Sequence, residues 1–461
     1  MRTLRLLPLA LAAALSACAV GPVHQVPVTP SPPAFKEAAG WVAATPADAL
    51  ERGPWWTLFQ DPVLNELVPQ VEVSNQNVAA AAAAYAQARA LVAQQRAALF
   101  PSVSLGLSGE RAGGRDRDAQ ASYRLNLGGS WEPDVWGRLR SGVTSARAGA
   151  AASAADLASA RLAAQGELAA NYFQLRQSDA QRALLATTID GYARVLQITK
   201  NRFEAGIAGK SDILQAETQL ANARVEELSL TRQRAQLEHA MAILIGKAPA
   251  QFALAPVPWQ VSVPAIPVGV PSLLLQRRPD IAAAERDVAA ANARIGIARA
   301  AYYPSIGLSG ALGSGGSKVG DLFSASNLLW SFGTSVAQSV FNAGATRASV
   351  AGAEAAHQVA VARYRQTVLA AFGEVEDQLV AARVLGEQLA LREQASRAAD
   401  QVETQMLNRY KAGQVGYTDV VQAQATALSA RRALVQLQAD RQTTAVALIQ
   451  SLGGGWQASL E

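Results

Sequence analysis

The chain has 461 residues, of which 50% are apolar but only 6% are aromatic, and its formal net charge is +5. Lys and Arg alternate with Asp and Glu instead of clustering, so the charge pattern excludes a nucleic-acid-binding surface. Much of the apolar content is alanine, which favours long helices that approach closely but fills a wide globular core poorly. Long packed helices are therefore expected.

The N-terminus has the pattern of a bacterial export signal. Arg2 and Arg5 precede an apolar run from Leu6 to Leu15, which is too short to span a bilayer. The run ends in a lipobox-like Leu-Ser-Ala before Cys18, the only cysteine. We predict a signal peptide over 1–17 and attachment of diacylglycerol to Cys18. The alternative is an ordinary export signal followed by an incidental cysteine.

The remainder of the chain is organised as a duplication. Each half has an Ala-rich helix, a β-hairpin and a long helical hairpin, and Pro-rich segments precede and separate the halves. We predict a tether over 18–62 that docks through Trp55, Trp56 and Phe59, a first repeat over 63–248, a linker over 249–279, a second repeat over 280–453 and a tail over 454–461.

The clearest sign of the duplication is a helix-to-strand corner that occurs twice. The sequence around Pro101, Arg-Ala-Ala-Leu-Phe-Pro-Ser-Val, returns around Pro304 as Arg-Ala-Ala-Tyr-Tyr-Pro-Ser-Ile. Proline disfavours helical geometry in the residue before it, and the apolar pattern after each proline has a period of two. The first corner should therefore end a helix that starts near Val63.

Two hairpins, 102–131 and 305–339, follow these corners. Large apolar residues alternate with Ser, Gly and Asn, a pattern typical of transmembrane β-strands, although a soluble sheet with one wet face would also show it. The hairpins supply only about four strands, and an open sheet would leave unpaired edges in hydrocarbon. Since the smallest closed membrane barrels need about eight strands, we expect a homo-oligomer, and a trimer would supply about twelve.

Each half then contains a long proline-free run, 137–205 and 344–412, followed by a shorter helix. Such helices should pack in coiled-coil-like pairs. The turns between them also repeat, since Asn201–Gly206 matches Asn408–Gly413. Four glycines are expected to permit these tight turns: Gly206, Gly209, Gly413 and Gly416.

No catalytic or metal-binding pattern is evident. The three histidines lie far apart in the sequence, and the Gly-rich stretch after Leu312 lacks the Gly-Lys-Ser/Thr ending of a phosphate loop. We therefore predict that the protein is not an enzyme and holds no cofactor or metal.

Several motifs together resemble the TolC-like outer-membrane efflux family, and in particular its lipoprotein branch, which serves drug pumps of the resistance-nodulation-division type. They are the two corners, the stretch Trp131-Glu132-Pro133-Asp134-Val135-Trp136-Gly137-Arg138, and the stretch from Arg277-Arg278-Pro279-Asp280 to Gly296. The resemblance implies an α+β membrane protein. It would be a homotrimer with a twelve-strand outer-membrane β-barrel, four strands per chain, a long periplasmic α-helical barrel and a mixed equatorial region.

The same resemblance implies a passive exit duct, in contact with outer-membrane lipid, that works with a periplasmic membrane-fusion (adaptor) protein and an inner-membrane pump. It places the adaptor-contact tips at Gly206, Gly209, Asp212, Gly413, Gly416 and Tyr417, although these residues could serve only as helix caps. It places the periplasmic gate near Thr418 and Gln422, with Asp419 as a substitute acidic residue. A type I protein secretion duct and a non-conducting scaffold lipoprotein remain the alternatives.

Overall fold

The computed structural model describes residues 20–29, 32–37, 54–115, 117–266 and 277–454. The predicted signal peptide, Cys18 and most of the C-terminal tail lie outside these residues. The chain divides into two compact units. The sheet unit comprises 1–29, 83–154 and 282–367, and the helical unit comprises 30–82, 155–281 and 368–461.

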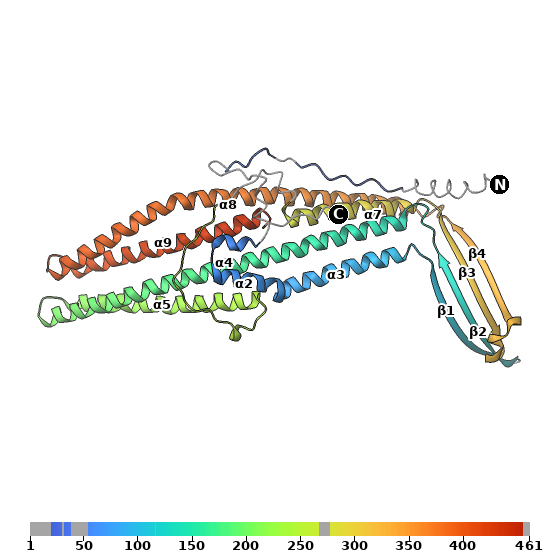
Figure 1. The fold of residues 1–461 in the computed structure, drawn as a ribbon, viewed down its shortest axis with the longest axis horizontal. Helices are drawn as coiled ribbons and strands as arrows, with labels where there is room; N and C mark the ends of the chain where they lie inside the picture. The colour runs from blue at the N-terminus through green and yellow to red at the C-terminus, as the bar shows by residue number, and fades with distance from the viewer. Residues whose placement is uncertain (1–19, 30–31, 38–53, 116, 267–276, 455–461) are drawn as a thin grey trace. The chain divides into compact units, whose positions relative to one another are not determined.

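The sheet unit contains one antiparallel sheet of four strands in the order β1-β2-β3-β4 (Figure 1). Both predicted hairpins are present, as β1 (Ser102–Gly114) with β2 (Arg117–Trp131) and β3 (Ser305–Gly316) with β4 (Leu328–Ala337). β2 pairs with β3 and thereby joins the two hairpins. The second hairpin differs in its loop, because β3 continues to Gly316 before two short 3-10 helices, Val319–Phe323 and Ala325–Asn327.

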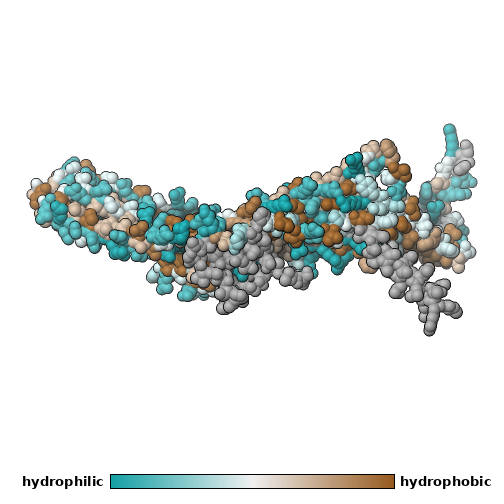
Figure 2. All heavy atoms as spheres, turned by 90° about the horizontal axis from the view of Figure 1, so that it is seen from above, coloured by the Kyte–Doolittle hydropathy of each residue, from teal (hydrophilic) through white to brown (hydrophobic). Residues whose placement is uncertain are grey.

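The strand register sorts the side chains onto two different faces, as the alternation predicted. On one face Leu127 pairs with Leu105 and Leu312, and Leu312 pairs with Trp330. On the other face the aligned residues are small or polar, for example Ser102, Ser130, Ser309 and Gly333. The large apolar side chains are exposed, and hydrophobic residues show on the surface in Figure 2. An exposed apolar face of this kind indicates contact with lipid or another chain.

The helices repeat with equal lengths. α3 (Gln76–Ala97) and α7 (Pro279–Ala300) have 22 residues each, α4 (Arg138–Glu204) and α8 (Ala345–Lys411) have 67, and α5 (Lys210–Leu244) and α9 (Tyr417–Ser451) have 35. The predicted duplication is thus confirmed. Gly142, Gly149, Gly166 and Gly191 lie inside α4 and do not interrupt it.

The prediction of one helix from Val63 to the first corner is wrong. α2 (Pro62–Ser74) ends at Ser74, and Asn75 separates it from α3. The Asn75 amide donates to the carbonyl of Leu244 at 2.8 Å, while its Oδ1 accepts from Asn77 N–H at 2.9 Å and Val78 N–H at 3.1 Å. This side chain caps α3, as asparagine does at helix starts.

The N-terminal tether docks as its aromatic residues predicted. Trp55, Trp56 and Phe59 lie in a short 3-10 helix, Trp55–Phe59, and are buried. Phe59 packs on Phe173 of α4 with the ring centroids 4.9 Å apart. Asp61 then caps α2 and accepts a hydrogen bond of 2.7 Å from the Tyr172 hydroxyl.

The end of β2 and the residues after it hold both helix-to-strand corners in place. The Trp136 indole donates to the carbonyl of Pro304 at 2.6 Å, and the Trp131 indole donates to the carbonyl of Leu99 at 3.0 Å. Each tryptophan thus fixes the backbone beside one corner, Pro101 or Pro304. Among the described residues, no helix combines the length and apolar character needed to cross a membrane.

Candidate functional site

The two turns between the long helices lie in the helical unit, and we call them the first tip (201–212) and the second tip (408–419). α4 and α8 are terminated in the same way, by a glycine two residues after the last helical residue. These glycines are Gly206, with φ +75°, and Gly413, with φ +74°. Each glycine N–H bonds the carbonyl three residues back, at 2.8 and 2.9 Å, and the next N–H bonds the carbonyl five residues back, at 2.8 and 2.9 Å. This is the Schellman motif, in which a left-handed residue ends the helix.

The other two glycines have a different role from the predicted one. Gly209 and Gly416 have φ of −83° and −74°, so neither turn needs glycine's access to positive φ at these positions. They precede the first residues of α5 and α9 as N-caps. Asp419 supports the second cap, because its Oδ2 accepts from the Gly416 N–H at 3.2 Å.

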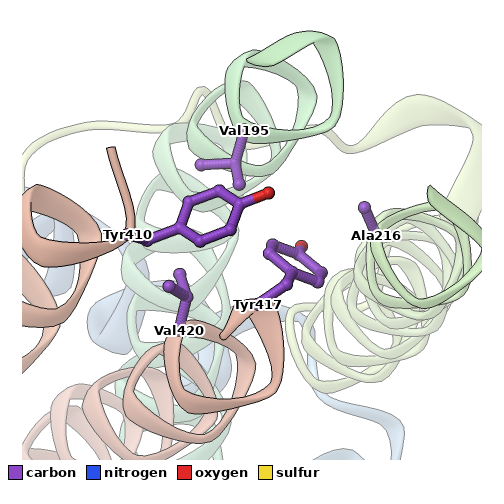
Figure 3. Close-up of a cluster of buried hydrophobic side chains, with 5 residues drawn as sticks. All are labelled: Val195, Ala216, Tyr410, Tyr417 and Val420. Carbon is purple, nitrogen blue, oxygen red and sulfur yellow. The ribbon is translucent and has the colours of Figure 1, made fainter. Parts of the chain in front are cut away.

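Behind the tips, a buried apolar cluster joins the first helical hairpin to the second. Val195 of α4 and Ala216 of α5 pack with Tyr410 of α8, and with Tyr417 and Val420 of α9 (Figure 3). The ring centroids of Tyr410 and Tyr417 are 5.5 Å apart, and the Tyr417 hydroxyl donates a hydrogen bond of 3.3 Å to Gln219 Oε1. Burial raises the pKa of Tyr417 to about 12, so its hydroxyl is neutral at ordinary pH.

Arg202, in the last turn of α4, forms a second link between the hairpins. Its Nη1 donates to the carbonyls of Tyr410 at 2.8 Å and Lys411 at 3.4 Å, the last two residues of α8. The guanidinium also lies 4.7 Å from the centroid of the Tyr410 ring. A cation at a helix C-terminus satisfies free carbonyls and interacts favourably with the helix dipole.

The three predicted gate residues lie on one side of α9. Thr418, Asp419 and Gln422 are exposed, whereas Tyr417 and Val420 on the other side are buried in the cluster. The buried side fixes the rotation of α9, and this rotation determines which side chains remain free. The first turns of α9 therefore present a polar side to their surroundings.

A groove between α5 and α9 was not predicted. It has a volume of about 820 Å³, and α4 also contributes to its wall. Its lining mixes apolar side chains, including Leu214, Val421 and Leu428, with a similar number of polar ones. Arg432 of α9 and Glu226 of α5, both of which line the groove, form an ion pair at 2.5 Å. No motif marks this groove, because it exists only where the two helices lie side by side.

Ion pairs also tie α9 to α8. Arg431 forms ion pairs with Asp400 at 2.7 Å and with Glu403 at 2.6 Å.

In the part of the chain that the structure describes, no group of three or more His, Cys, Asp or Glu residues could hold a metal ion.

Comparison with known proteins agrees with this architecture. The sequence profile of the outer membrane efflux protein family matches the chain twice, at residues 67–247 and 270–454. The toluene efflux pump outer membrane protein TtgC of Pseudomonas putida is 33% identical over 456 residues, 96% of this chain and 93% of TtgC. The cation efflux system protein CusC of Escherichia coli is 29% identical over 463 residues, 99% of this chain and 100% of CusC.

A solved structure shows the same fold. The outer-membrane channel OprN matches with a TM-score of 0.88 and 31% sequence identity, and the match covers 96% of this chain and 100% of OprN.

Proposed function

The chain belongs to the outer membrane efflux protein family, and we propose that three copies of it form the outer-membrane exit duct of a tripartite efflux pump. The duct conducts solutes passively from a periplasmic adaptor and an inner-membrane pump to the exterior of a Gram-negative cell. It catalyses no reaction and needs no cofactor.

The observation that carries this proposal is the open sheet. Its edge strands β1 and β4 each pair on one side only, and one face is apolar and exposed. Unpaired edges are not stable in hydrocarbon, so the sheet must continue into other chains. Three copies supply about twelve strands, which enclose a lumen wider than that of an eight-stranded barrel. The small and polar face then lines the water, and the apolar face meets the lipid.

We place the gate at the exposed side of α9. Thr418, Asp419 and Gln422 from three chains narrow the duct, since they are polar, adjacent and free of the cluster that anchors the helix. Asp419 also caps α9 through Gly416, so its carboxylate is partly engaged in local structure. Opening requires the helical hairpins to move apart, and the closed hydrogen-bond ladder of the barrel stays fixed.

We also propose the remaining parts of the assembly. The two tips, with Gly206, Gly209, Asp212, Gly413, Gly416 and Tyr417, meet the adaptor. Adaptor binding favours the open arrangement only if it makes better contacts there. Cys18 carries the lipid anchor, and the domain boundaries are those stated above, with the equatorial region formed by 18–62, the 249–279 linker and the C-terminal tail.

The transported substrate is not fixed by the lumen. TtgC is named for toluene efflux and CusC for cation efflux, and this chain resembles both. The polar face of the sheet carries mostly Ser, Gly and Asn, with Arg124 and Glu110 as charged residues, and the small polar residues are compatible with many solutes. We propose that the pump and the adaptor select the substrate.

The test is single-channel conductance in planar bilayers, with light scattering on the same purified sample. We expect a trimer of low conductance that rises severalfold in Gln422→Ala and Thr418→Ala. A matched control is Thr426→Ala, one turn beyond Gln422 on the same helix. A monomer, or a trimer that does not conduct even when both side chains are truncated, would exclude the duct and leave the scaffold. Conduction that couples only to an ABC exporter would instead indicate protein secretion.

A further inference from the structure

We propose that Arg409, at the end of α8, caps the end of α4 in a second copy of this chain and thereby connects neighbouring subunits at the tips. The inference rests on the trimer of the proposed function and adds one specific contact between its subunits. The partner is another copy of the same protein, and the contact is made by residues that the duplication makes equivalent to a contact within one chain.

The intrachain contact is the cap formed by Arg202. This side chain leaves the last turn of α4 and donates to the carbonyls of the last two residues of α8, Tyr410 and Lys411. It therefore joins the first helical hairpin to the second. The donor and the acceptors both lie at equivalent places, the final turns of two 67-residue helices.

The duplication supplies the same donor and acceptors again. Asn201-Arg202-Phe203-Glu204 of the first repeat corresponds to Asn408-Arg409-Tyr410-Lys411 of the second. Arg409 is thus the equivalent of Arg202, and the carbonyls of Phe203 and Glu204 are the equivalents of those that Arg202 caps. Within one chain Arg409 does not contact the carbonyls of Phe203 and Glu204. The first and second hairpins of a chain contact each other along one side only, and that side is used by Arg202.

The second set still has capacity to bind. Among the described residues the Phe203 carbonyl accepts only the Gly206 N–H, at 2.8 Å, whereas the equivalent Tyr410 carbonyl accepts both the Gly413 N–H and Arg202. Arg409 is exposed, and its side chain forms no hydrogen bond or ion pair with the described residues. Glu204 is likewise exposed, and within the same part of the chain its carbonyl accepts no hydrogen bond. Lys411, its equivalent, accepts from Arg202. A donor and an acceptor are therefore left over, one on each hairpin.

A closed ring of three chains brings these two groups together. First and second hairpins must alternate around the ring, so each second hairpin has a first hairpin of the next chain beside it. Charge favours this contact more than the intrachain one. Arg202 lies near Lys411, which has the same charge, whereas Arg409 would lie near Glu204 of the next chain, which has the opposite charge.

Cross-linking tests whether the two residues are neighbours. In a Cys18→Ser background, Arg409→Cys combined with Glu204→Cys provides the only two thiols, and a short bis-maleimide should join them between chains. We expect covalent dimers and trimers on denaturing gels. The matched control replaces Arg409→Cys with Arg392→Cys, which lies 17 residues earlier on α8, about 25 Å along the helix at about 1.5 Å per residue.

A charge-reversal cycle tests whether the contact is attractive. Arg409→Glu should raise the closed-state conductance about fivefold, since about 1 kcal/mol corresponds to roughly that factor. Arg409→Glu with Glu204→Arg should recover the part of this change that comes from charge attraction, although a carboxylate cannot replace the hydrogen bonds to the carbonyls. If the wild-type protein is a conducting trimer but the cysteine pair gives only monomers and the double reversal restores nothing, the inference is wrong and the duct stands. If the wild-type protein is not a trimer, the proposed function itself fails.

Discussion

Removing the ring of Tyr417 should release the start of α9 from the rest of the helical unit. The side chain is 3% exposed and packs against Tyr410, Val195, Ala216 and Val420. Truncation of a buried aromatic side chain to alanine costs about 3–5 kcal/mol. The tip is close to solvent and can relax, so we take the lower end, about 3 kcal/mol. At about 1.4 kcal/mol per tenfold, local opening becomes about a hundredfold more frequent.

Hydrogen exchange of the purified trimer measures this opening directly. Amides in the first turns of α9 should lose about a hundredfold in protection in Tyr417→Ala, while those of β1 and β2 should be unchanged. Tyr417→Phe is the matched control, because it removes only a 3.3 Å hydrogen bond to a partly exposed Gln219 and should cost at most about 1 kcal/mol. Equal losses in the two variants would refute the argument that ring packing holds this helix.

Three further predictions concern the same region. Burial raises the pKa of Tyr417 from 10.0 to about 12, so its contribution to stability is complete below pH 10 and is lost as pH rises towards 12. The difference in thermal midpoint between wild type and Tyr417→Phe should therefore shrink above pH 10 and reverse sign before pH 12, because the loss exceeds the hydrogen bond's contribution of about 1 kcal/mol. Arg202→Gln should weaken the last turn of α8 by about 1–2 kcal/mol, seen as faster hydrogen exchange there and not in α5, whereas unchanged exchange would mean that the cap adds nothing. Gly413→Ala places a side chain at φ +74° and should lower stability by about 1–2 kcal/mol in a thermal assay. Gly416→Ala, at φ −74°, should cost less, about 0.5 kcal/mol, because it adds no backbone strain and only exchanges glycine for a poorer N-cap residue.

The sequence predicted the repeat, the hairpins and the long helices because each depends on local signals. At Pro101 and Pro304 the spacing of apolar residues changes from the helical repeat to the two-residue repeat of a strand, and the sequence shows this change directly. The strand faces followed for the same reason, since alternation fixes which side chains share a face once the register is set.

Features that depend on distant partners were not predicted. The break at Asn75 depends on the carbonyl of Leu244, which is remote in sequence. The groove between α5 and α9 depends on which sides of two helices meet. All four tip glycines were expected to permit the turns, but only Gly206 and Gly413 have positive φ, and the sequence alone does not distinguish them from the N-cap glycines Gly209 and Gly416.

The gate prediction depends partly on local sequence and partly on distant partners. Sequence matching placed Thr418, Asp419 and Gln422 near one another on a helix, and the structure shows them together on its exposed side. Which side of α9 is exposed depends on the tyrosine cluster, which requires α4, α5 and α8. Their role in closing the duct stays a prediction.

The equal lengths of the paired helices restrict how this gene can change. One residue inserted into α4 would rotate everything beyond it by about 100° and advance it by about 1.5 Å. The Arg202 cap and the tyrosine cluster would then lose their partners on α8 and α9. An insertion can be tolerated in these helices only when α5 lengthens to match and the second repeat changes in the same way. We therefore expect related genes to vary in length at the loops and termini and to keep these helices at constant length.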